Sequence, residues 1–212
     1  MVQTKLNLPA RVLAPLLPYI VIGTGLLVLH NAWIAILSYH LGMVIILLCT
    51  GGKIYLKKIN RPDNYYILIF TASLGLAGGL LLYVLWPLLA VPGDINLYME
   101  NIGLNRDAWP YFITYFIVVN PWIEEYYWRG YLGSDLKKII LNDLLFAGYH
   151  ILVLMGKINI IWLIAVFVIL SLTAWLWRQA NRLNQGLITS IVSHTIADIS
   201  IILVIYFMTT GT

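Results

Sequence analysis

Long apolar runs alternate with short polar segments along the whole chain. An apolar run of about 20 residues is long enough to cross the hydrocarbon core of a bilayer as a helix. The pattern predicts membrane-spanning helices at residues 12–29, 32–50, 65–89, 109–128, 139–156, 158–177 and 187–209. We therefore expect an all-α fold, a polytopic membrane bundle of about seven transmembrane helices.

Composition supports the membrane setting. Hydrophobic residues make up 61% of the 212 residues and charged residues only 10%, whereas a soluble domain carries about 25% charged residues. With nearly all of the chain assigned to spans, we expect residues 1–212 to form a single integral membrane domain. We therefore expect the lipid bilayer to be a partner of the protein.

The net charge of +4 reflects membrane orientation rather than binding to nucleic acid. With seven spans, all but two of the 13 Lys and Arg residues fall in loops on one side, and only Arg106 and Lys157 lie opposite. The positive-inside rule then places the N-terminus in the cytoplasm and the C-terminus outside. The basic residues on the cytoplasmic side are Lys5, Arg11, Lys53, Lys57, Lys58, Arg61, Arg129, Lys137, Lys138, Arg178 and Arg182.

A few ionisable residues lie within the predicted spans. Glu124 and Glu125 end the fourth span and Arg129 follows it, His150 lies in the fifth, and the seventh carries His194 and Asp198. An ionisable group in hydrocarbon costs roughly 2.5 to 3.5 kcal/mol on insertion scales, so such groups usually serve a function.

Helix geometry predicts that these groups meet. At about 1.5 Å of rise per residue, His150 lies about 16 Å from the cytoplasmic side, His194 about 12 Å, Asp198 about 18 Å and Glu124 at most about 20 Å. Three helices thus bring polar groups to one level of the membrane.

Spacing within each helix assigns partners. Residues four apart share a helix face, which pairs His194 with Asp198, Phe146 with His150, and Glu125 with Arg129. We expect Glu125 and Arg129 to form a salt bridge that holds the helix end. Glu124 would then be unpaired and reactive.

Three motifs in this order resemble a known family. E-E-x-x-x-R at residues 124–129, F-x-x-x-H at 146–150 and H-x-x-x-D at 194–198 are similar to the motifs of the CPBP family, the CAAX proteases and bacteriocin-processing enzymes, also called Abi. That family comprises intramembrane glutamic endopeptidases. The resemblance covers roughly residues 110–205. It implies a catalytic core at 108–209, whereas the helices within 1–107 match only as generic membrane helices.

The resemblance implies a role for each residue. Glu124 would activate a water molecule, and His150 would position that water and shuttle its proton. His194 would stabilise the oxyanion, and Asp198 stands where family members commonly carry Asn. Glu125, Arg129 and Phe146 would support the site. Because an ionised carboxylate only accepts hydrogen bonds, Asp198 would either be protonated or orient His194, and we favour the second.

The implied function is hydrolysis of a peptide bond in a membrane-embedded or membrane-bound protein or peptide, without a cofactor. The alternative is a zinc protease with the metal at Glu124, His150 and His194. A small ion-coupled transporter and a non-catalytic immunity protein or chaperone are the non-protease alternatives. The short loops indicate a prokaryotic cell membrane.

Other features predict architecture. Asp143 is expected to cap the start of the fifth helix, and His30 and His40 are expected to be structural or interfacial. The G-x-x-x-G at Gly75 and Gly79 favours close packing between helices of the same chain.

Overall fold

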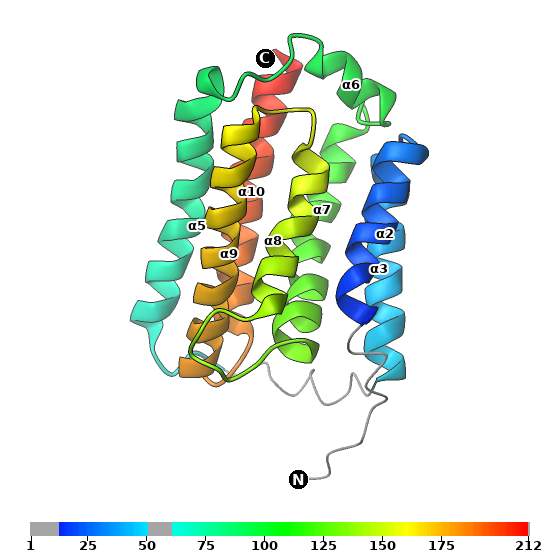
Figure 1. Ribbon diagram of the computed structural model, residues 1–212. Coiled ribbons are helices and arrows are strands. Elements are labelled where there is room, and N and C mark those ends of the chain that lie inside the picture. The colour runs from blue at the N-terminus through cyan, green and yellow to red at the C-terminus, as the bar shows by residue number, and fades with distance from the viewer. Residues whose placement is uncertain (1–12, 51–60, 212) are drawn as a thin grey trace.

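The computed structural model describes residues 13–50 and 61–211, and over these ranges it contains helices and no strands. Figure 1 shows the long helices standing side by side as one bundle, with the short helix α6 lying across the end where α10 finishes. The predicted all-α membrane bundle is therefore confirmed.

Helical residues occupy most of each predicted span. The first contains α2 (Leu17–Gly23), flanked by a 3-10 turn (Ala14–Leu16) and a π turn (Thr24–Val28). The others are α3 (Ala32–Cys49), α5 (Tyr65–Leu85), α7 (Trp109–Glu124), α8 (Leu141–Leu154), α9 (Ile160–Leu183) and α10 (Ile188–Thr210), and α6 (Ile95–Asn101) lies between α5 and α7. Asparagine side chains cap the starts of α3, α5 and α9.

Four helical segments are long and apolar enough to cross a membrane: Ala32–Cys49, Tyr65–Leu88, Ile160–Leu183 and Ile188–Thr210. Ala14–Val28 and Leu141–Leu154 are apolar but shorter, and α7 has 16 residues. Seven crossings and a cytoplasmic N-terminus therefore stay predictions. Five of the basic residues used for the orientation, Lys5, Arg11, Lys53, Lys57 and Lys58, lie outside the described residues.

Helix α9 is longer than predicted, because it ends at Leu183 and not near residue 177. The extra turns include Arg178, which is buried and binds Asp143 of α8 through Nε (3.0 Å to Oδ1) and Nη2 (2.7 Å to Oδ2). Asp143 Oδ2 also accepts from the backbone N–H of Ile140, at 3.0 Å, as the predicted cap does. An internal ion pair thus replaces the loop expected at Arg178.

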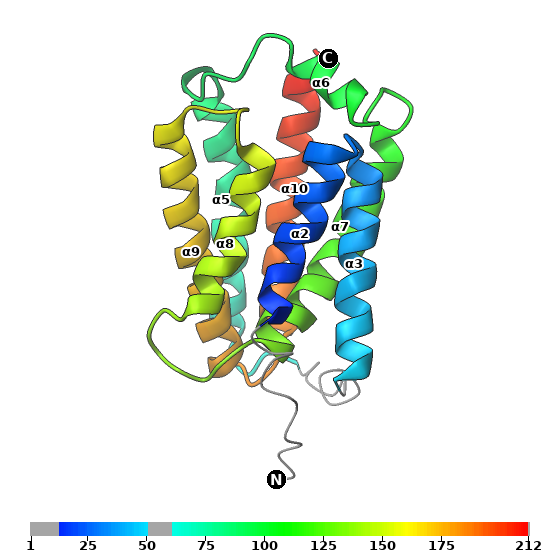
Figure 2. The ribbon, with the colours of Figure 1, turned by 45° about the vertical axis from the view of Figure 1, so that its right-hand side comes forward.

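Helix α5 packs closely on α10, the helix that carries His194 and Asp198. A Cβ atom at Gly75 would lie 2.8 Å from the backbone oxygen of Ser193, and one at Gly79 would lie 2.5 Å from that of Ser200. The Ser200 hydroxyl donates to the backbone oxygen of Gly75 at 2.9 Å. The predicted packing of the G-x-x-x-G within the chain is confirmed. Figure 2 shows α10 between α5 and α7, both of which it contacts.

Candidate active site

The first motif lies where α7 changes from an α-helix to a π-helix. Glu124 is the last residue of α7, and the π-helix η4 (Glu125–Tyr131) continues from it. Pro121 lies inside α7 one turn earlier and has no N–H to donate to the preceding turn. Short π segments within α-helices are frequent at functional sites. All seven residues of η4 are buried.

The Glu124 carboxylate is buried, with 1% of the residue exposed, and its two oxygens differ. Oε1 accepts hydrogen bonds from the hydroxyls of Tyr39 (2.5 Å) and Tyr149. Oε2 is buried without a hydrogen-bond partner and lies 3.6 Å from Nε2 of His194. The expectation of an unpaired Glu124 was therefore wrong, because Oε1 has two hydrogen-bond donors and Oε2, although it makes no hydrogen bond, faces His194. The tyrosines fix the carboxylate and leave one oxygen available.

His194 joins the acids of the site. Its Nδ1 lies 2.9 Å from Oε1 of Glu125, and its Nε2 lies 3.4 Å from Oδ1 of Asp198. Because an ionised carboxylate can only accept, the Glu125 contact places a hydrogen on Nδ1. The ring lies against Trp177 with centroids 4.6 Å apart. Glu125 is therefore the closer of these two acids to His194, a role that the spacing argument assigned to Asp198.

The predicted salt bridge between Glu125 and Arg129 is confirmed, with Nη1 3.0 Å from Oε1. Arg129 Nη2 has no hydrogen-bond partner, but the guanidinium lies 4.0 Å above the ring of Phe146 and 5.2 Å from that of Trp177. Aromatic faces attract a cation in this position. Phe146 thus packs directly on the charged group of the ion pair.

His150 is half-buried and lies beside the Glu124 site. Its Nδ1 is 2.8 Å from the backbone oxygen of Phe146, so Nδ1 donates and Nε2 keeps its lone pair. The link to Glu124 runs through Tyr149, whose ring centroid lies 4.0 Å from that of His150 and whose hydroxyl binds Glu124. The structure therefore brings Glu124, His194 and Asp198 together directly, and His150 alongside them.

Three polar residues of this site were not predicted, and His40 was expected to be structural. Tyr39 and Tyr149 bind Glu124, and Asn120 Nδ2 donates to Oδ2 of Asp198 at 3.0 Å. Asn120 in turn contacts Nε2 of His40 at 3.0 Å. A polar side chain deep in an apolar span was the only signal available for His40 and Asn120.

Among the described residues, no group of three or more His, Cys, Asp or Glu side chains is arranged to hold a metal ion. One nitrogen of each site histidine is engaged, by Glu125 in His194 and by the Phe146 backbone in His150, and each ring keeps its Nε2 for other partners. The zinc alternative at Glu124, His150 and His194 therefore stays a prediction to be tested by chelation.

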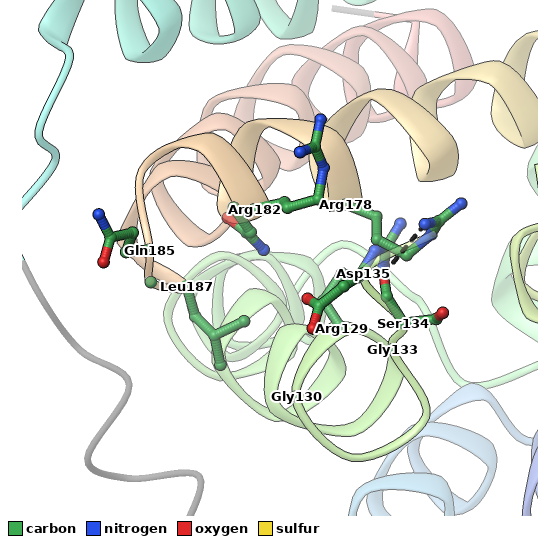
Figure 3. Close-up of a pocket in the computed structure, with 11 residues that line it drawn as sticks. Arg129, Gly130, Gly133, Ser134, Asp135, Arg178, Arg182, Gln185 and Leu187 are labelled. Carbon is green, nitrogen blue, oxygen red and sulfur yellow. Dashed lines mark hydrogen bonds between the residues drawn. The ribbon is translucent and has the colours of Figure 1, made fainter. Parts of the chain in front are cut away.

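A pocket of about 330 Å³ flanks the site at the end of the bundle. Figure 3 shows side chains from η4, the following loop, the end of α9 and the α9–α10 turn around it, with Arg178 bound to the backbone oxygen of Ser134. The pocket touches the site only through Arg129. Its lining residues are Arg129, Gly130, Gly133, Ser134, Asp135, Arg178, Asn181, Arg182, Gln185, Gly186 and Leu187.

A carboxylate and histidines that meet inside apolar helices define a site suited to acid–base chemistry within a membrane. Residues 106–200 match the model of a family described as type II CAAX prenyl endopeptidase Rce1-like. The resemblance to the CAAX proteases is thus confirmed over this part of the chain, and the match supports an intramembrane protease acting on a membrane-associated peptide. No curated protein and no solved structure matches the chain.

Proposed function

We propose that the protein is a glutamic-type intramembrane endopeptidase that hydrolyses a peptide bond of a membrane-embedded or membrane-bound protein or peptide. The observation that carries the proposal is the free Oε2 of Glu124, buried and 3.6 Å from His194 Nε2, while Oε1 is held by two tyrosines. A fixed carboxylate with one available oxygen is the geometry that a general base requires.

In the proposed reaction Glu124 Oε2 takes a proton from a water molecule, and the water oxygen attacks the peptide carbonyl carbon. His150, with its free Nε2 lone pair, helps to hold that water and to move its proton. His194, which in this scheme carries a hydrogen on both ring nitrogens, donates its Nε2–H to the oxyanion of the tetrahedral intermediate. The proton taken by Glu124 then passes to the amine as the C–N bond breaks, leaving a new carboxyl terminus and a new amino terminus. No acyl-enzyme forms.

Asp198, Glu125 and Arg129 are positioning residues in this scheme. Asp198 faces Nε2 and Glu125 binds Nδ1, so His194 is held from two sides. Arg129 balances the charge of Glu125 in turn. No step is assigned to a metal, and we place the protein in a prokaryotic cell membrane with its N-terminus in the cytoplasm.

The test compares cells that lack the native copy and express either the wild type or the Glu124→Gln variant. Terminal labelling and mass spectrometry of the membrane fraction should reveal peptide termini present with the wild type and absent with Glu124→Gln. The matched control is Glu100→Gln, an exposed glutamate on α6, which should behave as the wild type. Identical termini in all three would reject the protease and favour a transporter or a non-catalytic immunity protein.

A synthetic peptide that spans an identified cleavage site is then reconstituted with purified protein in lipid vesicles. Hydrolysis by the wild type and not by Glu124→Gln would show that the protein itself cleaves. Exhaustive chelation on the same peptide tests the zinc alternative, because a zinc enzyme would lose its activity.

A further inference from the structure

A chain of hydrogen bonds links helix α3 to Asp198. The Tyr115 hydroxyl lies 2.8 Å from Nδ1 of His40, His40 Nε2 lies 3.0 Å from Oδ1 of Asn120, and Asn120 Nδ2 donates to Oδ2 of Asp198 at 3.0 Å. His40, Asn120 and Asp198 are 2%, 4% and 8% exposed, respectively. Buried polar groups bond in this way because an unpaired one is costly, and a fully bonded network specifies one arrangement.

The hydrogen bonds of this network all run in one direction, from the Tyr115 hydroxyl to Asp198. An ionised Asp198 accepts only, so Asn120 must turn its NH2 group toward it and its carbonyl oxygen away. That oxygen then accepts from His40, which places the hydrogen of His40 on Nε2. Nδ1 is left to accept from the Tyr115 hydroxyl. Every donor in the chain therefore meets an acceptor.

The two carboxylate oxygens of Asp198 have different partners. Asn120 occupies Oδ2, and Oδ1 is turned to Nε2 of His194 at 3.4 Å. We propose that Asn120, held by His40, is a positioning residue that presents Asp198 to His194 as an acceptor, so that His194 keeps the Nε2 hydrogen it needs as a donor. The functional part of this inference rests on the proposed proteolysis.

Helix α3 is thereby part of the site, although it lies outside the family match at residues 106–200. Tyr39, the neighbour of His40, donates to Glu124. One turn of α3 thus holds Glu124 directly and Asp198 through Asn120.

Exchanging the two partners tests the proposal. In Asp198→Asn, the Asn120 amide still donates to residue 198, so the new side chain accepts with its oxygen and turns its NH2 group toward His194. Two donors then face each other. In the double variant Asn120→Asp/Asp198→Asn, the carboxylate at 120 accepts from both His40 and the amide at 198. The amide oxygen at 198 is then turned back toward His194.

The primary readout is the 15N resonances of the His194 ring in histidine-labelled protein in lipid nanodiscs, assigned by their loss in His194→Gln. They should shift in Asp198→Asn and return toward the wild-type positions in the double variant. The matched control is Ser193→Ala. Ser193 is next to His194 in the sequence but binds Thr71, which is not part of the hydrogen-bond network, so this variant should leave the His194 resonances in place. A double variant no closer to the wild type than Asp198→Asn would overturn the proposal.

If the double variant does not fold, the same spectra are measured on Asn120→Leu, which removes the hydrogen bond from residue 120 to Asp198. Unchanged His194 resonances in this variant would equally overturn the proposal. These spectra need no substrate, so they separate failure of this inference from failure of the proposed protease.

On a peptide cleaved in a Glu124-dependent manner, Asp198→Asn should lower kcat at least tenfold with little change in KM. The double variant should recover most of that loss. A purely structural role of Asn120 would instead change the unfolding midpoint and leave kcat of the folded protein unchanged.

Discussion

Replacing Arg178 by Met should destabilise the protein strongly, because its guanidinium holds both a helix and a loop. Nε and Nη2 bind the two oxygens of Asp143, and the backbone oxygens of Ser134, Leu136 and Lys138 accept from Nη1 and Nη2 at 2.5 to 3.0 Å. Without Arg178 the buried Asp143 carboxylate loses its cation and three carbonyls lose a donor. Removing one partner of a buried pair costs about 3–5 kcal/mol.

The assay is reversible unfolding in mixed micelles, followed by circular dichroism as SDS is added. The control is Arg182→Met on the same helix, where Nε donates to Gln179 and the residue is half-buried; its loss should be about 1 kcal/mol or less. Arg178→Met/Asp143→Leu should be less destabilised than Arg178→Met alone, since no uncompensated charge remains. A cost of Arg178→Met below about 1 kcal/mol would refute the reasoning.

Three further predictions use smaller changes. Gly79→Ala should destabilise the bundle by about 1–3 kcal/mol, because the new Cβ would lie 2.5 Å from the α10 backbone. The control Gly78→Ala makes only an ordinary contact at 3.8 Å and should be near neutral, so equal unfolding midpoints of the two variants would contradict the prediction. Tyr149→Phe should lower kcat about 10- to 100-fold, because the Glu124 carboxylate loses one of the hydroxyls that hold it. The control Tyr127→Phe loses a bond to the backbone and should leave kcat unchanged, and a wild-type kcat in Tyr149→Phe would show that Tyr149 does not position Glu124. Exhaustive chelation should leave peptide cleavage unchanged, and elemental analysis should find no stoichiometric zinc; loss of cleavage that zinc restores would reverse this.

Much of the fold could be predicted from local pattern. Apolar runs of helical length locate the helices, and residues four apart on one helix locate the Glu125–Arg129 pair, because both properties depend on neighbours in the sequence. The cap at Asp143 is local in the same sense. These predictions are confirmed.

The contacts between helices could not be predicted in the same way. Periodicity indicates which face of a helix a residue occupies but not which helix lies opposite. The bonds from Tyr39 to Glu124 and from Asn120 to Asp198 therefore could not be predicted. The change from an α-helix to a π-helix at Glu125 could not be predicted from regular helix spacing either. Both glutamates approach His194 in the structure.

The place of Tyr39 on α3 limits how the protein can be divided. A fragment that begins near residue 106 would carry all three motifs and yet lack one of the two hydroxyls that hold Glu124 Oε1. Transplanting that fragment into another bundle would therefore move the reactive groups without part of their support. The smallest portable unit of this site includes α3, whose sequence carries none of the motifs.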